Sequence, residues 1–410
     1  MRQTGTNLSK VAQYNRAVVL DQIRFADGIS RVEIAQLTGL TPQTVSGIVR
    51  RFIAEGIVRE DGSGRSSGGK PRTRLLVNAS AGRAVGVHFD PAELSCVVVD
   101  LLGTPLGSLR RPTPPDADPA LIAAAVAELV DEVLAGAGVA REEVLGLGIV
   151  TPGPIDHGRG LLMAPPQLAG WTRVPLGRLV AEATGLPVTL ENDATAAAIG
   201  ERWAGAGRGV ANFAYVFLGT GVGGGLVLEH QVYRGGSMNA AEFGHTSVRP
   251  DGPLCYCGNT GCLETLVSPA AVVANVRHRL AAGEGAGSVL SSGDPRDLTH
   301  DAVYRAAAGG DRFAARIADE AAEHVATVVV NVVNIVDVEL VVLGGLGIRH
   351  VQDRFRSTVE RALRTRPLAR QIRTARVELS PLVQDGAAIG GAALVLYATY
   401  SPQVSALLSL

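Results

Sequence analysis

Lysine is nearly missing from this sequence, and none follows Lys70. A phosphate site that depends on a lysine is therefore excluded from the rest of the chain. There are four cysteines, three of them within eight residues, which argues against a disulfide framework and fits a reducing compartment. The N-terminus lacks a signal-peptide core. The most apolar run, residues 326–346, is no membrane span, because it is interrupted by the polar side chains of Asn331, Asn334, Asp337 and Glu339. We therefore expect a cytoplasmic protein.

Charge is distributed unevenly along the 410 residues, although the net charge is only −1. Residues 1–80 contain 12 Lys and Arg against 6 Asp and Glu, a net charge of +6, and the remainder carries −7. A basic head on an acidic body predicts that only the head binds a polyanion. The length and the 46% hydrophobic content are typical of a globular protein with two or three domains.

A cluster of soft metal ligands stands near the middle of the chain. Cys255, Cys257 and Cys262 follow His245 by ten to seventeen residues, and three thiolates with one imidazole complete a tetrahedral shell for zinc. A site with no open position is structural, so we expect the metal to hold this loop. Glu242 and Glu264 flank the loop, and we expect it to hold both acids towards a small polar ligand. The alternative is that the cysteines are buried hydrophobes and His245 caps a turn.

The basic head reads as three helices, predicted over 15–26, 31–37 and from Pro42 onward. Thr41 is the expected cap of the third helix. Its apolar residues recur at helical spacing, which predicts one buried face; they are Val45, Ile48, Val49, Phe52 and Ile53. The opposite face is suited to reading a DNA major groove through polar side chains, namely Gln43, Thr44, Ser46 and Arg50.

Two short strands, predicted over 57–60 and 73–77, enclose a basic loop rich in Gly and Ser. This pattern is typical of a wing, whose Arg65, Lys70 and Arg72 would reach phosphates or a narrow minor groove. We therefore predict a winged helix-turn-helix that binds DNA. The alternative is a three-helix protein-interaction module with a solvated loop.

Beyond the head, strands alternate with helices, which indicates an α/β fold. The loop that contains Gly153 follows a predicted strand, as a ligand-contacting loop does in such proteins. Asn192 and Asp193 end another strand, over 188–190, and precede a helix predicted over 195–203. A carboxylate beside an amide suits vicinal hydroxyls. The alternative is that Asp193 only caps the helix.

The sequence resembles the ROK family, named for repressor, open reading frame and kinase. Members carry Glu-x-Gly-His followed by C-x-C-G-x-x-G-C-x-E, as residues 242–245 and 255–264 do here. The resemblance implies two ribonuclease-H-like lobes that close on each other, as in actin and sugar kinases. We expect a winged helix-turn-helix over 1–80 and a first lobe over 81–200. The C-terminal segment 385–410 completes that lobe, and the second lobe, with the zinc loop, spans 201–384.

The resemblance also implies a sugar site between the lobes. In the family's kinases the residue that matches Asp193 takes a proton from the sugar hydroxyl, and the one that matches Asn192 binds the same sugar. We expect the site to consist of Gly153, Asn192, Asp193, Glu242, His245 and Glu264. Here Asp193 would be a vestige of the kinase base, with no catalytic role.

The sequence departs from the kinases at their phosphate-binding turn, Asp-x-Gly-Gly-Thr-Lys. The matching positions are His88, Asp90, Pro91, Ala92 and Glu93. Pro91 removes an amide donor and Asp90 would repel phosphate, so we predict no ATP-dependent activity. We expect the glycine-rich segment 219–225 to be a hairpin around a vestigial phosphate loop.

The predicted function is a sugar-responsive transcriptional regulator, with repression expected. It would bind a two-fold operator as a homodimer, with a tetramer as a further option. A monosaccharide or derivative would alter DNA affinity. One alternative is an ATP-dependent hexose kinase with a DNA-binding head, and another is a repressor that responds to a partner protein.

Overall fold

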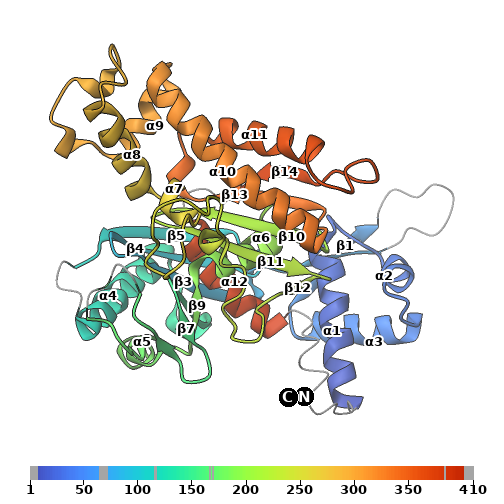
Figure 1. The fold of residues 1–410 in the computed structure, drawn as a ribbon. Helices are drawn as coiled ribbons and strands as arrows, with labels where there is room; N and C mark the ends of the chain where they lie inside the picture. The colour runs from blue at the N-terminus through green and yellow to red at the C-terminus, as the bar shows by residue number, and fades with distance from the viewer. Residues whose placement is uncertain are drawn as a thin grey trace.

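The computed structural model describes residues 8–63, 73–114, 118–165, 168, 170–382 and 385–400. The N-terminal head contains three helices and a two-stranded antiparallel sheet (Figure 1). These are α1 (Leu8–Phe25), α2 (Arg31–Thr38), α3 (Pro42–Ala54), β1 (Val58–Ser63) and β2 (Thr73–Val77). Helix α1 begins seven residues earlier than the predicted Asn15, because the apolar pattern marks only the part that packs on the head core.

Local capping explains where helices α2 and α3 of the head begin. Ser30 and Glu33 form a capping box at the start of α2, and the Thr41 side chain accepts a hydrogen bond from the Thr44 amide at the start of α3. The predicted apolar face of α3 is inside the head: Val45, Val49 and Phe52 are buried. Ile48 and Ile53 pack against the same cluster and are partly exposed.

The first lobe is a five-stranded sheet of order β5-β4-β3-β6-β9. Its strands are β3 (Arg83–Phe89), β4 (Glu93–Asp100), β5 (Pro105–Pro112), β6 (Val144–Thr151) and β9 (Val188–Asn192). Strands β3 to β5 are antiparallel and β6 and β9 run parallel to β3. Helices α4 (Pro119–Ala137) and α5 (Leu176–Thr184) cover one face, and a small hairpin of β7 (Ile155–Asp156) and β8 (Leu161–Leu162) lies near its edge.

The other face of this sheet is covered by the last helix, α12 (Gly386–Tyr400). Side chains therefore alternate along β3: Val85 and Val87 pack on the α4 side, and Ala84 packs on the α12 side. Gly86 fits under α12 because a methyl group there would lie 1.8 Å from the Ala388 carbonyl oxygen. The C-terminal helix thus returns to the first lobe, as the sequence suggested.

The second lobe is a five-stranded sheet of order β12-β11-β10-β13-β14. Its strands are β10 (Phe213–Leu218), β11 (Val222–Leu228), β12 (Gln231–Val232), β13 (Leu340–Gly344) and β14 (Arg376–Leu379). Its helices are α7 (Glu264–Val267), α8 (Pro269–Ala281), α9 (His300–Ala308), α10 (Arg312–Val336) and α11 (Gln352–Thr365). Sequence reasoning missed α7, α9 and α11. None of the helices in the described ranges is long and apolar enough to cross a membrane.

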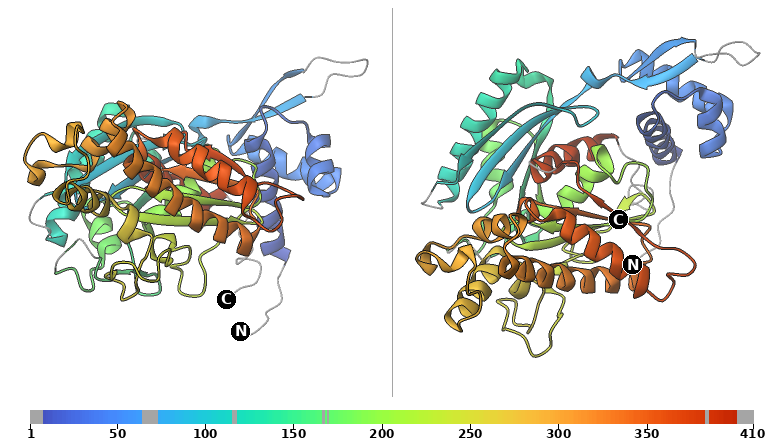
Figure 2. Two further views of the ribbon diagram at one scale, coloured as in Figure 1. Left: turned by 45° about the horizontal axis from the view of Figure 1, so that its top comes forward. Right: turned by 90° about the horizontal axis from the view of Figure 1, so that it is seen from above.

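Helix α6 (Asp193–Ala204) lies between the two sheets, and every residue from Asp193 to Trp203 is buried. It contacts α12 on one side and β11 on the other. Glycines permit both contacts: a methyl group on Gly390 would lie 2.3 Å from the Ala196 carbonyl oxygen, and one on Gly225 would lie 2.5 Å from the Ala198 Cβ. The proposed lobe boundary at residue 200 falls inside this helix. The views in Figures 1 and 2 show the head on one side of the body formed by the two lobes.

Candidate functional site

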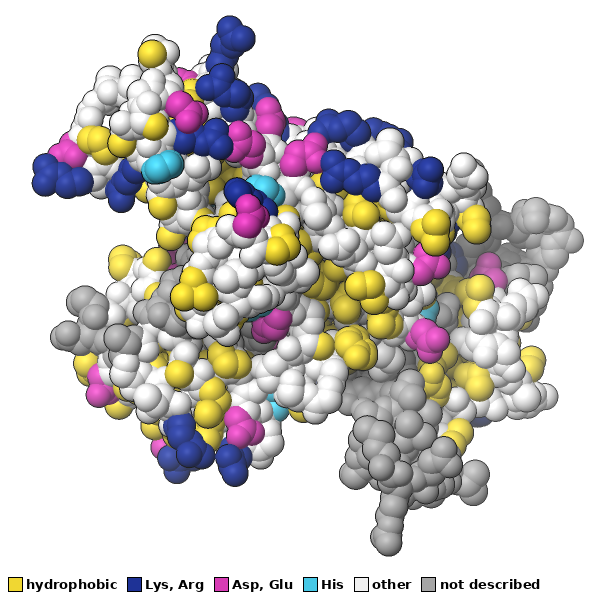
Figure 3. Space-filling model, in the orientation of Figure 1, with side chains coloured by type: hydrophobic (Ala, Val, Ile, Leu, Met, Phe, Trp, Pro, Cys, Tyr) yellow, Lys and Arg dark blue, Asp and Glu magenta, His cyan; other side chains and the backbone are white. Residues whose placement is uncertain are grey.

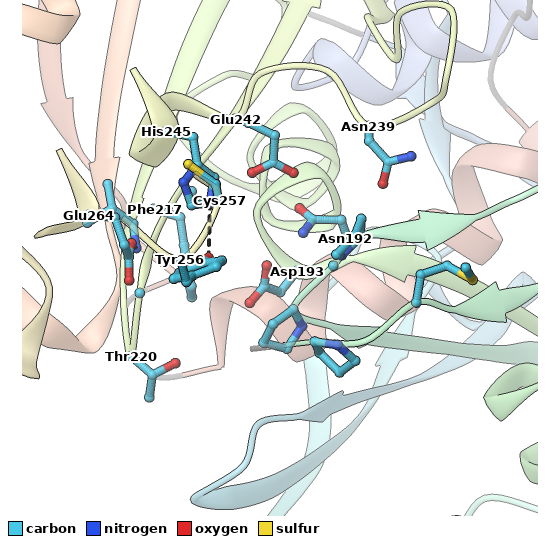
Figure 4. Close-up of a pocket in the computed structure, with 18 of the residues that line it drawn as sticks. Asn192, Asp193, Phe217, Thr220, Asn239, Glu242, His245, Tyr256, Cys257 and Glu264 are labelled. Carbon is cyan, nitrogen blue, oxygen red and sulfur yellow. Dashed lines mark hydrogen bonds between the residues drawn. The ribbon is translucent and has the colours of Figure 1, made fainter. Parts of the chain in front are cut away.

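A cavity of about 460 Å³ lies between the lobes. All six residues predicted to contact a sugar line it: Gly153, Asn192, Asp193, Glu242, His245 and Glu264. They come from four separate segments of the chain, and Figure 4 shows the labelled acids and amides arranged around one space. In the space-filling view the surface is hollowed between the upper and lower halves of the molecule (Figure 3). The fold therefore collects the predicted residues into one concave site.

Asn192 and Asp193 are presented at the start of α6. The Asn192 side-chain oxygen caps the helix, accepting hydrogen bonds from the amides of Ala194 and Thr195 at 3.0 and 3.1 Å. The alternative considered from the sequence, that Asp193 caps this helix, is wrong, because Asp193 is its first residue. Asp193 accepts one bond from the Ala194 amide, and its second oxygen lies 3.7 Å from His88 Nε2. The cap does not use the Asn192 amide nitrogen or that second oxygen.

Glu242 and Glu264 face the same cavity from the second lobe. Glu264 accepts a hydrogen bond of 2.7 Å from the Val222 amide, which fixes its carboxylate beside the turn of β10 and β11. Burial raises the pKa of Glu264, and the negative charge of Asp193 adds to the effect. Glu242 keeps contact with solvent, yet partial burial of its carboxylate, with the charges of Asp193 and Glu264, raises its pKa to about 7. Three acids thus surround one cavity, and the described residues that line it include no lysine or arginine.

The remaining wall is largely apolar. Met163, Leu168 and Phe217 line it together with several prolines. A cavity with convergent polar groups and an apolar face is suited to a small ligand that has both, such as a sugar ring. Asn239, which sequence reasoning missed, holds the two sides together: its side chain bonds the amide and the carbonyl of Ile155, each at 2.9 Å. These bonds fix the loop that carries Gly153.

His245, Cys255, Cys257 and Cys262 come together, with their ligand atoms all within 4.8 Å of one another. The Cys255 sulfur lies 3.6 Å from His245 Nδ1, and the sulfurs of Cys257 and Cys262 lie 3.7 Å apart. Metal–ligand bonds of about 2.0–2.3 Å in a tetrahedron place neighbouring ligand atoms about 3.5–3.8 Å apart. The four side chains therefore fit a single tetrahedral metal ion.

The second nitrogen of His245 has a partner that the sequence did not reveal. Its Nε2 lies 3.0 Å from the hydroxyl of Tyr256, the dashed line in Figure 4, and the two rings pack edge to face with centroids 5.1 Å apart. Tyr256 stands between two of the cysteines, where the motif gives no preference for a side chain. The sequence predicts that His245 contacts the sugar as well as the metal, and here its second nitrogen contacts a residue that also lines the cavity.

The hairpin between β3 and β4 reaches the other lobe through Asp90. Its carboxylate accepts hydrogen bonds from the Thr220 hydroxyl at 2.6 Å and from the Ala92 amide at 2.8 Å. Thr220 belongs to the glycine-rich segment, which forms the expected hairpin: residues 219–221 are the turn between β10 and β11. A second cavity, of about 520 Å³, lies beyond this contact, and its lining includes His88, Asp90 and Glu93. The Asp90 carboxylate thus joins the β3–β4 turn to the turn between β10 and β11.

The predicted DNA-reading side chains of α3 are accessible. Gln43 and Arg50 are exposed, while Thr44 and Ser46 are half-buried. Thr44 also shares its hydroxyl with the Thr41 cap, at 2.9 Å. The wing residues Arg65, Lys70 and Arg72 lie outside the described residues. The head therefore presents the N-terminal part of α3 to solvent, as a major-groove reader requires.

Two sequence profiles match this architecture. That of winged helix-turn-helix DNA-binding domains matches residues 19–59, and that of the ROK family matches residues 84–398. The chain belongs to the ROK family. The ROK match includes both sheets, α6 and the cysteine cluster, so the two-lobed α/β fold and the preceding winged helix-turn-helix are confirmed.

Similar proteins include regulators and kinases of the ROK family. A putative xylose repressor from Caldicellulosiruptor is 29% identical over 95% of this chain and 97% of its own. The crystal structure of a ROK-family transcriptional regulator, a homologue of the Escherichia coli MLC protein, is 26% identical over 97% of this chain and 98% of its own, with a TM-score of 0.78. A ROK glucokinase from Streptomyces griseus, in complex with glucose and AMPPNP, is 30% identical over 76% of this chain and 99% of its own, with a TM-score of 0.68.

Proposed function

We propose that this ROK protein is a sugar-responsive DNA-binding repressor. The observation that carries the proposal is a winged helix-turn-helix with an accessible α3 on the same chain as a cavity lined by Asn192, Asp193, Glu242 and Glu264. Its similarity over nearly the full length to a putative xylose repressor supports this assignment. A homodimer, with a tetramer as the alternative, would place two heads on a two-fold operator.

The ligand of the cavity is, on this proposal, a monosaccharide or a close derivative. The carboxylates would accept hydrogen bonds from hydroxyl groups, the Asn192 amide nitrogen would donate one, and Phe217 would pack on the ring. The similar Streptomyces griseus glucokinase was crystallised with glucose, which agrees with a sugar as ligand. The direct test is a titration of operator DNA with and without a panel of sugars. A panel in which no sugar alters operator affinity would refute the sugar response.

The metal of the cysteine cluster is proposed to be structural Zn²⁺, held by His245, Cys255, Cys257 and Cys262. Three thiolates and an imidazole are the ligands that zinc prefers, and they fill all four positions. A bound zinc would join the segment after Glu242 to the segment before Glu264 and so fix both acids at the cavity. With these two acids, the proposed sugar contacts are Gly153, Asn192, Asp193 and His245.

We also propose that the protein has no kinase activity. Asp90 holds Thr220 in the position where phosphate groups would approach, and Pro91 offers no amide hydrogen. Transfer of a phosphoryl group depends on positioning and on neutralising negative charge, and the β3–β4 turn adds negative charge instead.

We expect no ADP release above background when the protein is incubated with ATP, Mg²⁺ and a panel of hexoses. A coupled assay measures this directly. The result that would contradict it is turnover that disappears in the Asp193→Asn variant, because loss of the base would identify genuine catalysis at this site.

Replacing Arg50 with Ala is expected to weaken operator binding by roughly tenfold, the usual effect of losing one base or phosphate contact. Sugar affinity should be unchanged, since no residue of α3 lines the cavity. Fluorescence anisotropy measures the first quantity and calorimetry the second. The matched control is Arg178→Ala on α5, an exposed arginine of the body. If Arg50→Ala lost both operator binding and sugar binding, Arg50 would instead be a residue that stabilises the fold.

A further inference from the structure

Helix α6 reaches from the sugar cavity to the DNA-binding head. Its N-terminal end carries Asn192 and Asp193, which line the cavity. Its C-terminal end carries Arg202 and Trp203, which contact α1 of the head. The helix has twelve residues, so these ends are about 18 Å apart.

The contact with the head is a buried polar network. Arg202 donates to Asp21 of α1 at 2.7 Å, and Arg24 of α1 donates to the same carboxylate at 2.9 Å. Arg24 also donates to the Trp203 carbonyl at 2.8 Å, and its guanidinium lies 3.7 Å above the indole ring. These four side chains are at most 5% exposed. Burial lowers the pKa of Arg24 to about 10, although Asp21 opposes the shift.

The network also reaches the rest of the body. Arg202 donates to the carbonyl of His230, in the turn between β11 and β12, at 2.9 Å. Trp203 donates to the carbonyl of Leu101, in the turn after β4, at 3.1 Å. The end of α6 therefore joins the head to both lobes at one point.

Helix α6 is not free to bend between its two ends. Gly200 and Gly390 bring it against α12, and Gly223 and Gly225 bring β11 against Ala194 and Ala198. Close packing of this kind transmits a displacement instead of absorbing it, because the neighbouring backbone leaves no space. A movement of Asn192 would therefore also displace Arg202 and Trp203.

We infer that α6 couples the two activities, with Arg202 and Trp203 as positioning residues that set the angle of the head according to the state of the sugar cavity. The inference rests on the proposed sugar response and specifies its route. A purely structural role for the network would fix the head at one angle and leave the response to sugar unaffected by its loss.

Arg202→Met tests this route without leaving a buried charge unpaired. The Asp21–Arg24 pair remains, and methionine fills a similar volume. Arg24→Met is the complementary variant, in which the Asp21–Arg202 pair remains. Each full-length variant is titrated with operator DNA with and without the sugar that gives the largest response in the wild type, and direct sugar binding is measured by calorimetry. The matched control is Arg279→Met, which removes an ion pair with Glu320 on the far side of the second lobe.

A wild-type coupling ratio of about 5- to 150-fold is typical of such switches. We expect the ratio to fall to within about twofold of unity in Arg202→Met and Arg24→Met, with sugar affinity unchanged and Arg279→Met like the wild type. An unchanged ratio in both folded variants would overturn the inference. A wild type that shows no sugar response would overturn the proposed function itself.

Hydrogen exchange on the wild-type protein provides a readout that needs no variant to fold. The sugar is expected to change the protection of the amides at the end of α1, residues 21–25, and at the end of α6. Unchanged exchange at both ends, in a protein whose operator affinity responds to sugar, would also overturn the inference.

Discussion

Replacing Asp193 with Asn is expected to lower the affinity for the sugar by about 10- to 100-fold, the effect of losing one hydrogen bond to a charged acceptor. The substitution keeps the size of the side chain and removes the carboxylate oxygen near His88. Helix α6 should remain intact, because its cap is the oxygen of Asn192. The sugar concentration needed to alter operator binding should rise by the same factor, while operator affinity without sugar stays as in the wild type.

Calorimetry with the sugar measures this loss, and anisotropy with the operator measures the response. Asp131→Asn is the matched control, since Asp131 is an exposed carboxylate of α4 that faces Arg141. If the Asp193→Asn variant bound sugar normally, the ligand would not contact the start of α6 as proposed. An altered operator affinity without sugar would instead show that Asp193 also sets the resting angle of the head.

The elements that could be predicted from the sequence are those with local causes. The starts of α2 and α3 are set by short local signals, Ser30 with Glu33 for α2 and Thr41 with Pro42 for α3. Each signal spans at most four residues, so the sequence predicts both helix starts. The cysteine cluster was also foreseeable, because its ligand spacing is itself the signal.

The parts that could not be predicted depend on contacts between distant segments. Asp90 and Thr220 are 130 positions apart, and nothing near either residue indicates that a carboxylate would join the lobes there. Asp21 and Arg202 are 181 positions apart, and both read as ordinary helix-surface charges until the fold buries them.

Tyr256 illustrates a different limit. The motif fixes the cysteines on either side of it but not the residue between them, and the tyrosine side chain is 63% exposed. Its hydroxyl contacts the second imidazole nitrogen of His245, a residue predicted both to bind the metal and to contact the sugar. A sugar that uses His245 would have to displace this contact, so Tyr256 competes with the ligand for one hydrogen bond.

Removing the metal is expected to abolish the sugar response while leaving the head able to bind DNA. Through His245 and Cys262 the metal would join the segments that hold Glu242 and Glu264. Binding of a structural zinc ion supplies much of the free energy that orders such a loop, so these segments should become disordered without it. The Cys257→Ser variant removes one of four ligands at an exposed position, so little core packing is lost with it. We expect substoichiometric metal by mass spectrometry and a lower melting temperature, because a structural zinc site needs all four of its ligands. Because the loop between Glu242 and Glu264 would no longer be held in place, the sugar affinity should fall by about tenfold or more.

The control variant for this test is Cys96→Ser, which changes the buried cysteine of β4 in the first lobe. A hydroxyl in the core lowers stability there too, but the metal content and the sugar response should persist. Dialysis of the wild type against a chelator should reproduce the effect of Cys257→Ser, and added Zn²⁺ should reverse it. A wild-type protein that carries no metal and still responds to sugar would show that the ordered loop needs only its own hydrogen bonds, such as that from the Leu263 amide to the Thr246 carbonyl at 3.0 Å.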